Sequence, residues 1–245
     1  MFEKPVFVFT TDIDWASEHC IQTLLAAMQE RGVTPTAFAT HKSPVLSAAN
    51  AAGIVNVGLH PNFLPGSSHG DTREKVIDHV FTLFPNARSF RSHAMVDDSH
   101  ISMAMKKRDI LYDSNLCLYL QAELVPLHHW TGIPRFPMFW ADDIHWRRDG
   151  KFYLEPYEKL FFSPGLKIIG VHPFMFTLNL SDHQTYLRLK PKISTLTSED
   201  ADKLFSPGPG AQSFLLELID AVHKKGFVFH TLDDVYKTYP KEGIV

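Results

Sequence analysis

Residues 6–15 read Val6-Phe7-Val8-Phe9-Thr10-Thr11-Asp12-Ile13-Asp14-Trp15, an apolar run that leads directly into two carboxylates. Runs rich in Val and Phe are typical of strands buried on both faces of a parallel sheet. The pattern returns in Gly58-Leu59-His60-Pro61 and Gly170-Val171-His172-Pro173, where a histidine follows the strand. The carboxyl ends of barrel strands form one rim, where active sites are built, so we expect these acids and histidines to meet there.

Further strands alternate with helices along the rest of the chain. Strands are expected over 36–40, 54–59, 87–91, 110–113, 136–141, 166–171 and 227–232. Helical periodicity with capping signals predicts helices over 18–31, 43–52, 71–84, 99–107 and 210–225. The polar, Pro-containing segment 184–209 is interpreted as an excursion or lid. This order predicts an α/β protein with seven or eight β/α units in a single domain over residues 1–245.

The composition narrows the class of protein. A chain of 245 residues with 44% hydrophobic residues can bury a full core. Its net charge of -3 shows no excess of basic residues of the kind that binds nucleic acid. No stretch of the sequence approaches the ~18 consecutive apolar residues of a membrane-spanning helix. Cys20 and Cys117 match no zinc or redox spacing and are expected to be reduced. The residues after Met1 show neither the basic region nor the long apolar region of a signal peptide, so a cytoplasmic enzyme is expected. The sequence does not indicate the oligomeric state.

The two aspartates and the first histidine suggest a mononuclear metal site. Asp12 and Asp14 alternate, so they point to opposite sides unless the strand bends. One could bind the metal while the other accepts a proton from water, or one could cap the helix that starts near Ser17. His60 opens a loop that contains His69, and two imidazoles with one carboxylate leave metal positions open for water and substrate.

Charged residues follow the later strands as well. Arg91 could orient Asp12 or form a structural ion pair, and His93, two residues on, could substitute for a metal ligand. An acid follows a strand at Asp113 and again in Trp140-Ala141-Asp142-Asp143, where it could bind substrate hydroxyls, tune a histidine or cap a turn. His172 is placed to act as a general acid, because imidazole changes protonation near neutral pH.

The order of acid pair, histidine loop, arginine, acid and late histidine resembles the polysaccharide deacetylase superfamily (NodB-like, carbohydrate esterase family 4). Within it the chain looks most like the WbmS-like branch associated with lipopolysaccharide O-antigen biosynthesis. The resemblance implies a distorted (β/α)7 barrel that hydrolyses N-acetyl groups with one divalent metal ion, commonly zinc. It implies Asp12 as base, with a swap with Asp14 possible, and His172 as the late histidine. It also implies Asp14, His60 and His69 as metal ligands.

The sequence departs from the family pattern in several places. The family's two aspartates are adjacent, whereas Ile13 separates them here. The family's two ligand histidines lie about one helical turn apart, so here the loop has to reach His69. The arginine motif keeps Arg91 without its proline, and the aspartate–tryptophan element fits Asp142 or Asp143. Residues expected to contact substrate are Asp113, Trp140, Asp142 and Asp143.

The sequence therefore predicts a metal-dependent hydrolase that removes an N-acyl group from a carbohydrate or a sugar-nucleotide-like molecule. Two other interpretations stay open. One is a glycan-binding barrel that has lost catalysis, favoured by the altered histidine motif. The other is a phosphoesterase on the same kind of barrel, against which the lack of a basic rim beyond Arg91 argues mildly.

Overall fold

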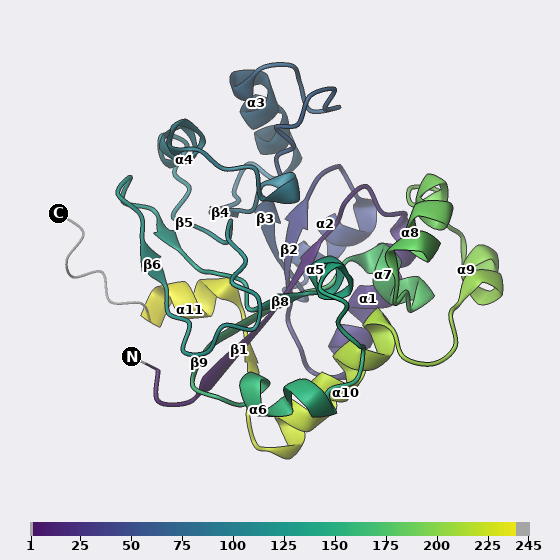
Figure 1. The fold of residues 1–245 in the computed structure, drawn as a ribbon. Helices are drawn as coiled ribbons and strands as arrows, with labels where there is room; N and C mark the ends of the chain where they lie inside the picture. Colours follow the sequence, from purple (N-terminus) through teal and green to yellow (C-terminus); the bar gives the residue numbers. More distant parts are fainter. Residues whose placement is uncertain (1, 239–245) are drawn as a thin grey trace.

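The computed structural model describes residues 2–238, which form one α/β unit with a curled sheet at its centre and helices around it (Figure 1). Six parallel strands are hydrogen-bonded side by side. Their order across the sheet is β5 (Tyr112–Asp113), β4 (Ser89–Phe90), β3 (Asn56–Leu59), β2 (Thr36–Ala39), β1 (Pro5–Asp12) and β9 (Gly165–Gly170).

The extended segment 134–141 joins the first and last of these six strands. Its first residues, β7 (Pro134–Arg135), pair with β5, and its last residues, β8 (Trp140–Ala141), pair with β9. Within the described residues the segment thus acts as a seventh parallel strand. Since β4, β5, β7 and β8 have only two residues each, the barrel is irregular on that side. The predicted distorted (β/α)7 barrel is confirmed.

Two short strands lie outside this ring, and helices cover it. β6 (Leu127–His128) is antiparallel to β7, and β10 (Phe229–His230) pairs with β1. The helices are α1 (Glu18–Glu30), α2 (Pro44–Ala51), α3 (Arg73–Leu83), α4 (Ser99–Lys106), α5 (Asp142–Arg147), α6 (Glu158–Phe161), α7 (Pro173–Leu178), α8 (His183–Leu189), α9 (Ser198–Leu204), α10 (Ala211–Lys224) and α11 (Leu232–Thr238).

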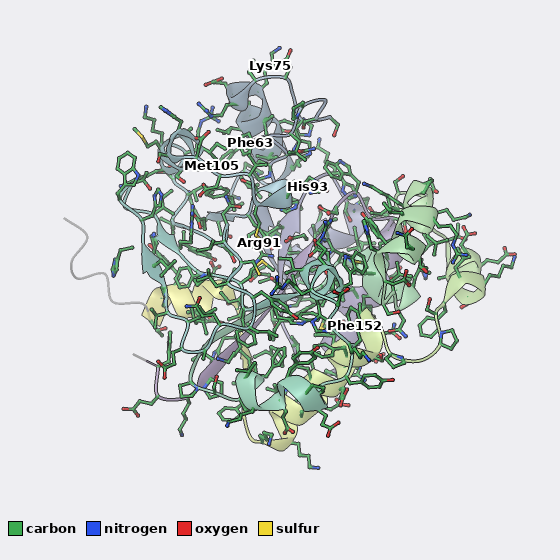
Figure 2. The ribbon with its side chains drawn as sticks, viewed as in Figure 1. Phe63, Lys75, Arg91, His93, Met105 and Phe152 are labelled. Carbon is green, nitrogen blue, oxygen red and sulfur yellow. The ribbon has the colours of Figure 1, made fainter. Side chains whose placement is uncertain are left out.

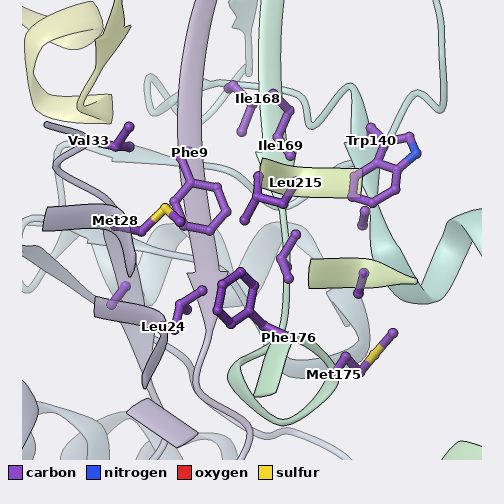
Figure 3. Packing of buried hydrophobic residues seen from close by; sticks show 14 of the residues in the cluster. Phe9, Leu24, Met28, Val33, Trp140, Ile168, Ile169, Met175, Phe176 and Leu215 are labelled. Atoms are coloured by element: carbon purple, nitrogen blue, oxygen red, sulfur yellow. The ribbon is translucent and has the colours of Figure 1, made fainter. Parts of the chain in front are cut away.

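The main core lies where β1 and β9 pack against α1, α7 and α10. Phe9 of β1 is fully buried, and Figure 3 shows it beside Met28 of α1 and Leu215 of α10. The side chains of α1 that are buried recur at helical spacing, and its N-terminus is capped by Ser17, whose side chain accepts a hydrogen bond from the Cys20 N–H. Packing on both faces holds β1 rigidly, so the residues at its carboxyl end have a fixed position.

The segment 184–209, expected to be an excursion or lid, contains most of α8 and all of α9, with the short 3₁₀ turn Lys190–Lys192 after α8. Asp182 and Thr197 cap the two helices, each accepting a hydrogen bond from a backbone N–H in the first turn. These caps stabilise helices that polar composition alone does not indicate. Both cysteines are free, as expected, and no helix in residues 2–238 is long and apolar enough to cross a bilayer.

Candidate active site

A left-handed bend after β1 brings Asp12 and Asp14 to the same cavity. Pairing with β2 continues to Ile13, whose N–H donates to the Phe38 carbonyl at 3.1 Å. Asp14 and Trp15 then adopt positive φ angles of 44° and 57°. Such angles are uncommon for residues other than glycine and reverse the alternation of an extended chain. Both aspartates line one cavity as a result.

Asp14, His60 and His93 form a group with the donor set of a metal site. The Asp14 Oδ1 atom lies 3.1 Å from His60 Nε2 and 3.0 Å from His93 Nδ1. One ligand atom from each residue lies within 4.8 Å of the other two. Two imidazole nitrogens and one carboxylate oxygen suit zinc and neighbouring first-row metals, and leave coordination positions open. The residues present therefore fit one divalent ion.

His69 lies outside this group, in contrast to the expected ligand set. Its Nδ1 accepts a hydrogen bond from the Asn62 N–H at 3.1 Å, so its Nε2–H donates to the Thr40 carbonyl at 2.8 Å. Burial lowers the pKa of His69 to about 4, with a further contribution from the stacked His79 ring. Both ring nitrogens are occupied by backbone groups, and the structure brings His93 rather than His69 to Asp14.

His93 reaches Asp14 because the chain after β4 turns sharply. His93 begins a 3₁₀ turn, and the next two residues, Ala94 and Met95, both have a positive φ of 53°. The His93 N–H donates to the Pro61 carbonyl at 2.9 Å, which places this turn beside the loop after β3. In Figure 2 His93 and Arg91 are both drawn near the middle of the molecule. No sequence signal indicates left-handed backbone at an Ala-Met pair.

Arg91 holds Asp12 at the edge of the group. The Arg91 side chain is fully buried, and its Nη1 donates to Asp12 Oδ1 at 2.8 Å. Three of its other N–H groups donate to Thr10 Oγ1, the Ser114 carbonyl and Ser114 Oγ at 3.1, 3.0 and 2.8 Å. Burial raises the pKa of Asp12, but Arg91, His60 and His172 together lower it below its usual range. Asp12 is thus an ionised carboxylate in a fixed position.

His172 and Asp142 form an acid–base pair opposite Asp12. His172 follows β9 and caps α7, and Pro173 occupies the first turn of that helix. Its Nδ1 lies 2.7 Å from Asp142 Oδ1, and its backbone N–H donates to Asp142 Oδ2 at 2.8 Å. Burial lowers the pKa of His172, but the charge and hydrogen bond of Asp142, with Asp14, raise it well above its usual value. The other nitrogen, Nε2, lies 3.6 Å from Asp14 Oδ2.

Of the four residues expected to contact substrate, Asp143 lines the cavity and the other three do not. Asp113 is buried and binds Arg135 through two hydrogen bonds of 2.7 and 2.9 Å. Trp140 is buried in the core and stacks on Phe214, with ring centroids 4.7 Å apart. Neither lines the cavity, and Asp142 supports His172 instead. Asp143 does line the cavity; burial, with the neighbouring Asp142, raises its pKa.

The cavity has a volume of about 490 Å³ and contains the groups described above at its inner end. Sequence reasoning missed its aromatic side, formed by Trp146 of α5 and Tyr186 of α8, whose ring centroids lie 5.4 Å apart. Both rings are on helices rather than at strand ends. Their meeting depends on how α8 packs against α5, which the sequence pattern does not indicate.

Comparison with known families agrees with this geometry. The family model "WbmS-like: Polysaccharide deacetylase" matches residues 9–190, and the chain therefore belongs to this family of deacetylases. This match confirms the family predicted from the order of the motifs, and the matched range contains all the site residues named above. A search of curated proteins gave no significant match.

Two solved structures, with TM-scores above 0.5, show the same fold. A candidate polysaccharide deacetylase involved in O-antigen biosynthesis, from Bordetella bronchiseptica, is 26% identical; the match covers 90% of this chain and 91% of that one, with a TM-score of 0.81. The 4-alpha-glucanotransferase of Thermococcus litoralis is 10% identical with a TM-score of 0.55, covering 96% of this chain and 38% of that one, and shares the fold alone. The family 4 carbohydrate esterase of Streptomyces lividans, in complex with acetate, gives 9% identity over 97% and 96% of the chains and a TM-score of 0.49.

Proposed function

We propose that this protein is a metal-dependent deacetylase that removes an N-acetyl group from a sugar or a precursor of a surface polysaccharide. The observation that carries the proposal is the meeting, at one cavity, of a His₂Asp group, an ionised carboxylate and a supported histidine. The role of the Bordetella relative in O-antigen biosynthesis supports the surface-polysaccharide context.

Asp14, His60 and His93 would hold the ion. Imidazole and carboxylate ligands suit zinc, and cobalt or nickel is compatible with the same donors. When bound, a divalent ion supplies Lewis acidity toward the amide carbonyl and toward water. The His60 side chain is almost fully buried, and its Nε2 lies 3.1 Å from Asp14 Oδ1, while its Nδ1 has no hydrogen-bond partner among residues 2–238.

Asp12 would accept the proton of the attacking water. Arg91 keeps this carboxylate ionised and aimed into the cavity, because three further hydrogen bonds, to Thr10 and Ser114, fix the guanidinium in the barrel wall. His172 would donate a proton from Nε2 to the amine that leaves as the C–N bond breaks. Asp142, bound to Nδ1, keeps the ring oriented and favours its protonated form. The products are acetate and a free amino sugar.

The test combines metal content with acetate release from N-acetylated sugars. The wild-type protein is expected to bind about one equivalent of zinc and to release acetate. Asp14→Ala should lose both metal and activity. Asp12→Asn should keep the metal and lose about 10²- to 10⁴-fold in rate, the usual contribution of general base catalysis. Asp220→Asn, which removes an exposed carboxylate on α10, is the matched control.

Two results would overturn the proposal. A metal-replete wild-type protein that binds glycans without releasing acetate would be a glycan-binding barrel. Hydrolysis of phosphate esters, but not of amides, in a panel containing both would identify a phosphoesterase. Full activity in Asp12→Asn would remove Asp12 from the role of base.

A further inference from the structure

The outer part of the cavity has a composition that N-acetyl hydrolysis alone does not require. Its side is formed by the end of α5 and by α8 with the 3₁₀ turn that follows it. Trp146 and Tyr186 present aromatic rings there, and His183 stacks on Tyr186 with ring centroids 6.4 Å apart. Flat apolar rings of this kind provide a surface for the face of a sugar ring or a base.

Two cations flank these rings. Arg147 follows Trp146 at the end of α5 and lines the cavity. Lys190 lines it from the other segment, with its Nζ 5.9 Å from the centroid of the Tyr186 ring. Both side chains are exposed, and neither forms an ion pair with a carboxylate in the part of the chain that the structure describes. Two positive charges thus lie at the entrance, and among the described residues neither has a carboxylate within 4.0 Å.

The acids of the cavity do not neutralise these cations. At the inner end Asp12 is paired with Arg91 at 2.8 Å, and Asp14 contacts two histidines. Among the acids that line the cavity, Asp143 is the nearest to Arg147 in sequence; Arg147 lowers its pKa electrostatically, but the two do not come within 4.0 Å. Burial and Asp142 still leave the pKa of Asp143 raised overall. None of the acids that line the cavity therefore comes within ion-pair distance of Arg147 or Lys190.

We propose that Arg147 and Lys190 bind an anionic group carried by the substrate sugar, a phosphate or a carboxylate, while the N-acetyl group lies at the inner end. The inference rests on the proposed deacetylase function for the reacting group. A guanidinium offers a planar pair of donors that matches both oxyanions, and an ammonium adds a point charge. The two residues are far apart in sequence, which is why the sequence showed no basic rim beyond Arg91.

The experiment measures binding in the metal-loaded Asp12→Asn protein, in which turnover is suppressed. Calorimetry compares four probes: N-acetylglucosamine, its 1-phosphate, N-acetylglucosaminuronic acid and UDP-N-acetylglucosamine. The anionic probes should bind more tightly than the neutral sugar, and the difference should shrink at high salt. A tighter phosphate identifies a glycosyl phosphate or nucleotide sugar as the class of substrate, and a tighter carboxylate identifies a uronic acid.

Variants assign this preference to the two cations. Arg147→Ala and Lys190→Ala should each weaken the anionic probes about tenfold, as expected for a charge-assisted hydrogen bond, and leave the neutral sugar nearly unchanged. Arg148→Ala and Arg188→Ala are the matched controls, since both side chains are exposed on the same two helical segments but do not line the cavity. Arg147→Lys should recover part of the loss.

Three results would overturn the inference: equal affinity for neutral and anionic probes, a preference that survives in the Arg147→Ala/Lys190→Ala double variant, or no binding of any probe. Failure of the deacetylase proposal gives a different result. In that case the wild-type protein releases no acetate from any probe, while the preference for anions and its dependence on Arg147 and Lys190 stay measurable.

Discussion

The two sides of the barrel rim position their reactive groups in different ways. On the side of β1, β3 and β4, the candidate metal ligands lie in loops that contain left-handed backbone, at Asp14 and directly after His93. On the side of β8 and β9, Asp142 is the first residue of α5 and His172 caps α7, so both follow regular strand-to-helix junctions. A helix start fixes a side chain through ordinary backbone geometry, whereas an irregular loop needs support from its neighbours.

We call the side of β1, β3 and β4 the metal side and the side of β8 and β9 the acid side. On the metal side, substitution of residues outside the metal group is expected to change metal binding. On the acid side, only substitutions within the His172–Asp142 pair are expected to have a large effect on activity. The backbone conformations at Asp14, Ala94 and Met95 are costly for residues with a side chain, and surrounding contacts have to hold them. Substitutions on the two sides of the rim can test this difference between residues held by irregular loops and residues held at helix starts.

The largest expected effect separates His93 from His69. His93→Ala should remove a ligand, and with it the bound metal and nearly all activity. His69→Gln should keep about one equivalent of metal, because an amide can replace both hydrogen bonds that the neutral ring makes to Asn62 and Thr40. Elemental analysis of the two purified variants measures the difference. Loss of metal in His69→Gln with retention in His93→Ala would reinstate the ligand set expected from the sequence.

The same contrast explains what could be predicted from the sequence. The strands, the order of the barrel and the positions of Asp12, His60 and His172 follow from apolar runs that end at a polar residue. The pairing of Arg91 with Asp12 also follows, because both lie at the ends of strands in one sheet. The sequence indicates His93 only as a substitute ligand, since a sequence pattern carries no record of the positive φ angles that aim it.

Side-chain contacts between residues distant in sequence were the second feature that could not be predicted from the sequence. Asp113 has the same pattern as Asp12, an acid at the end of a strand, yet Arg135 on the adjacent β7 neutralises it inside the wall. Trp140 was expected at the substrate and lies in the core because α10 brings Phe214 against it. In both cases a partner distant in sequence decides whether the side chain faces the cavity.

A second prediction concerns the acid side. Asp142→Asn removes the charge that raises the pKa of His172, so this pKa should fall. A general acid is active only while protonated, so the decline of the rate at alkaline pH should begin at a lower pH than in the wild type. At neutral pH we expect a loss of about 10²-fold, in the range of general acid catalysis, with the metal content unchanged.

The pH–rate profile of kcat/KM measures this effect. Asp143→Asn is the control, because Asp143 also raises the pKa of His172 but makes no hydrogen bond to its ring; its profile should shift less. Identical profiles for the wild type and Asp142→Asn would show that His172 is not the acid.

A smaller effect is expected at Asn115, which supports the His93 turn without touching the cavity. Its Oδ1 accepts a hydrogen bond from the Ser92 N–H at 3.0 Å, and its Nδ2 donates to the Val96 carbonyl at 3.2 Å. Asn115→Ala frees both ends of the turn and should weaken metal binding about 10- to 100-fold, the usual cost of losing an outer hydrogen bond at a metal site. Competition with a chelator measures the metal Kd.

Asn56→Ala is the matched control for this variant, because the Asn56 side chain approaches Asp233 at 3.5 Å, in a separate pocket. It should leave the metal Kd unchanged. An unaltered Kd in Asn115→Ala would show that the His93 turn holds its conformation without this support, and the proposed contrast between the two sides of the rim would weaken.

The smallest expected effect is on stability rather than activity, and it again concerns His69. Burial holds the pKa of His69 at about 4 in the folded protein, below the value of 6.5 for an exposed ring. Between these two values the unfolded chain binds a proton that the folded chain does not, so the free energy of unfolding falls as the pH falls from about 6.5 to about 4. At 1.36 kcal/mol per pKa unit, the interval from 6.5 to about 4 sets an upper limit of about 3.4 kcal/mol for the loss from this residue.

His69→Gln cannot titrate, so its stability should decline less over the same range of pH, and the advantage of the wild type should shrink as the pH falls. Urea unfolding of the metal-free proteins at several pH values between 7 and 4 measures this difference, in which contributions of the other histidines common to both chains cancel. Parallel curves would mean that the His69 ring takes up a proton in the folded state as readily as in the unfolded chain, so that burial and the Asn62 and Thr40 hydrogen bonds do not keep it neutral.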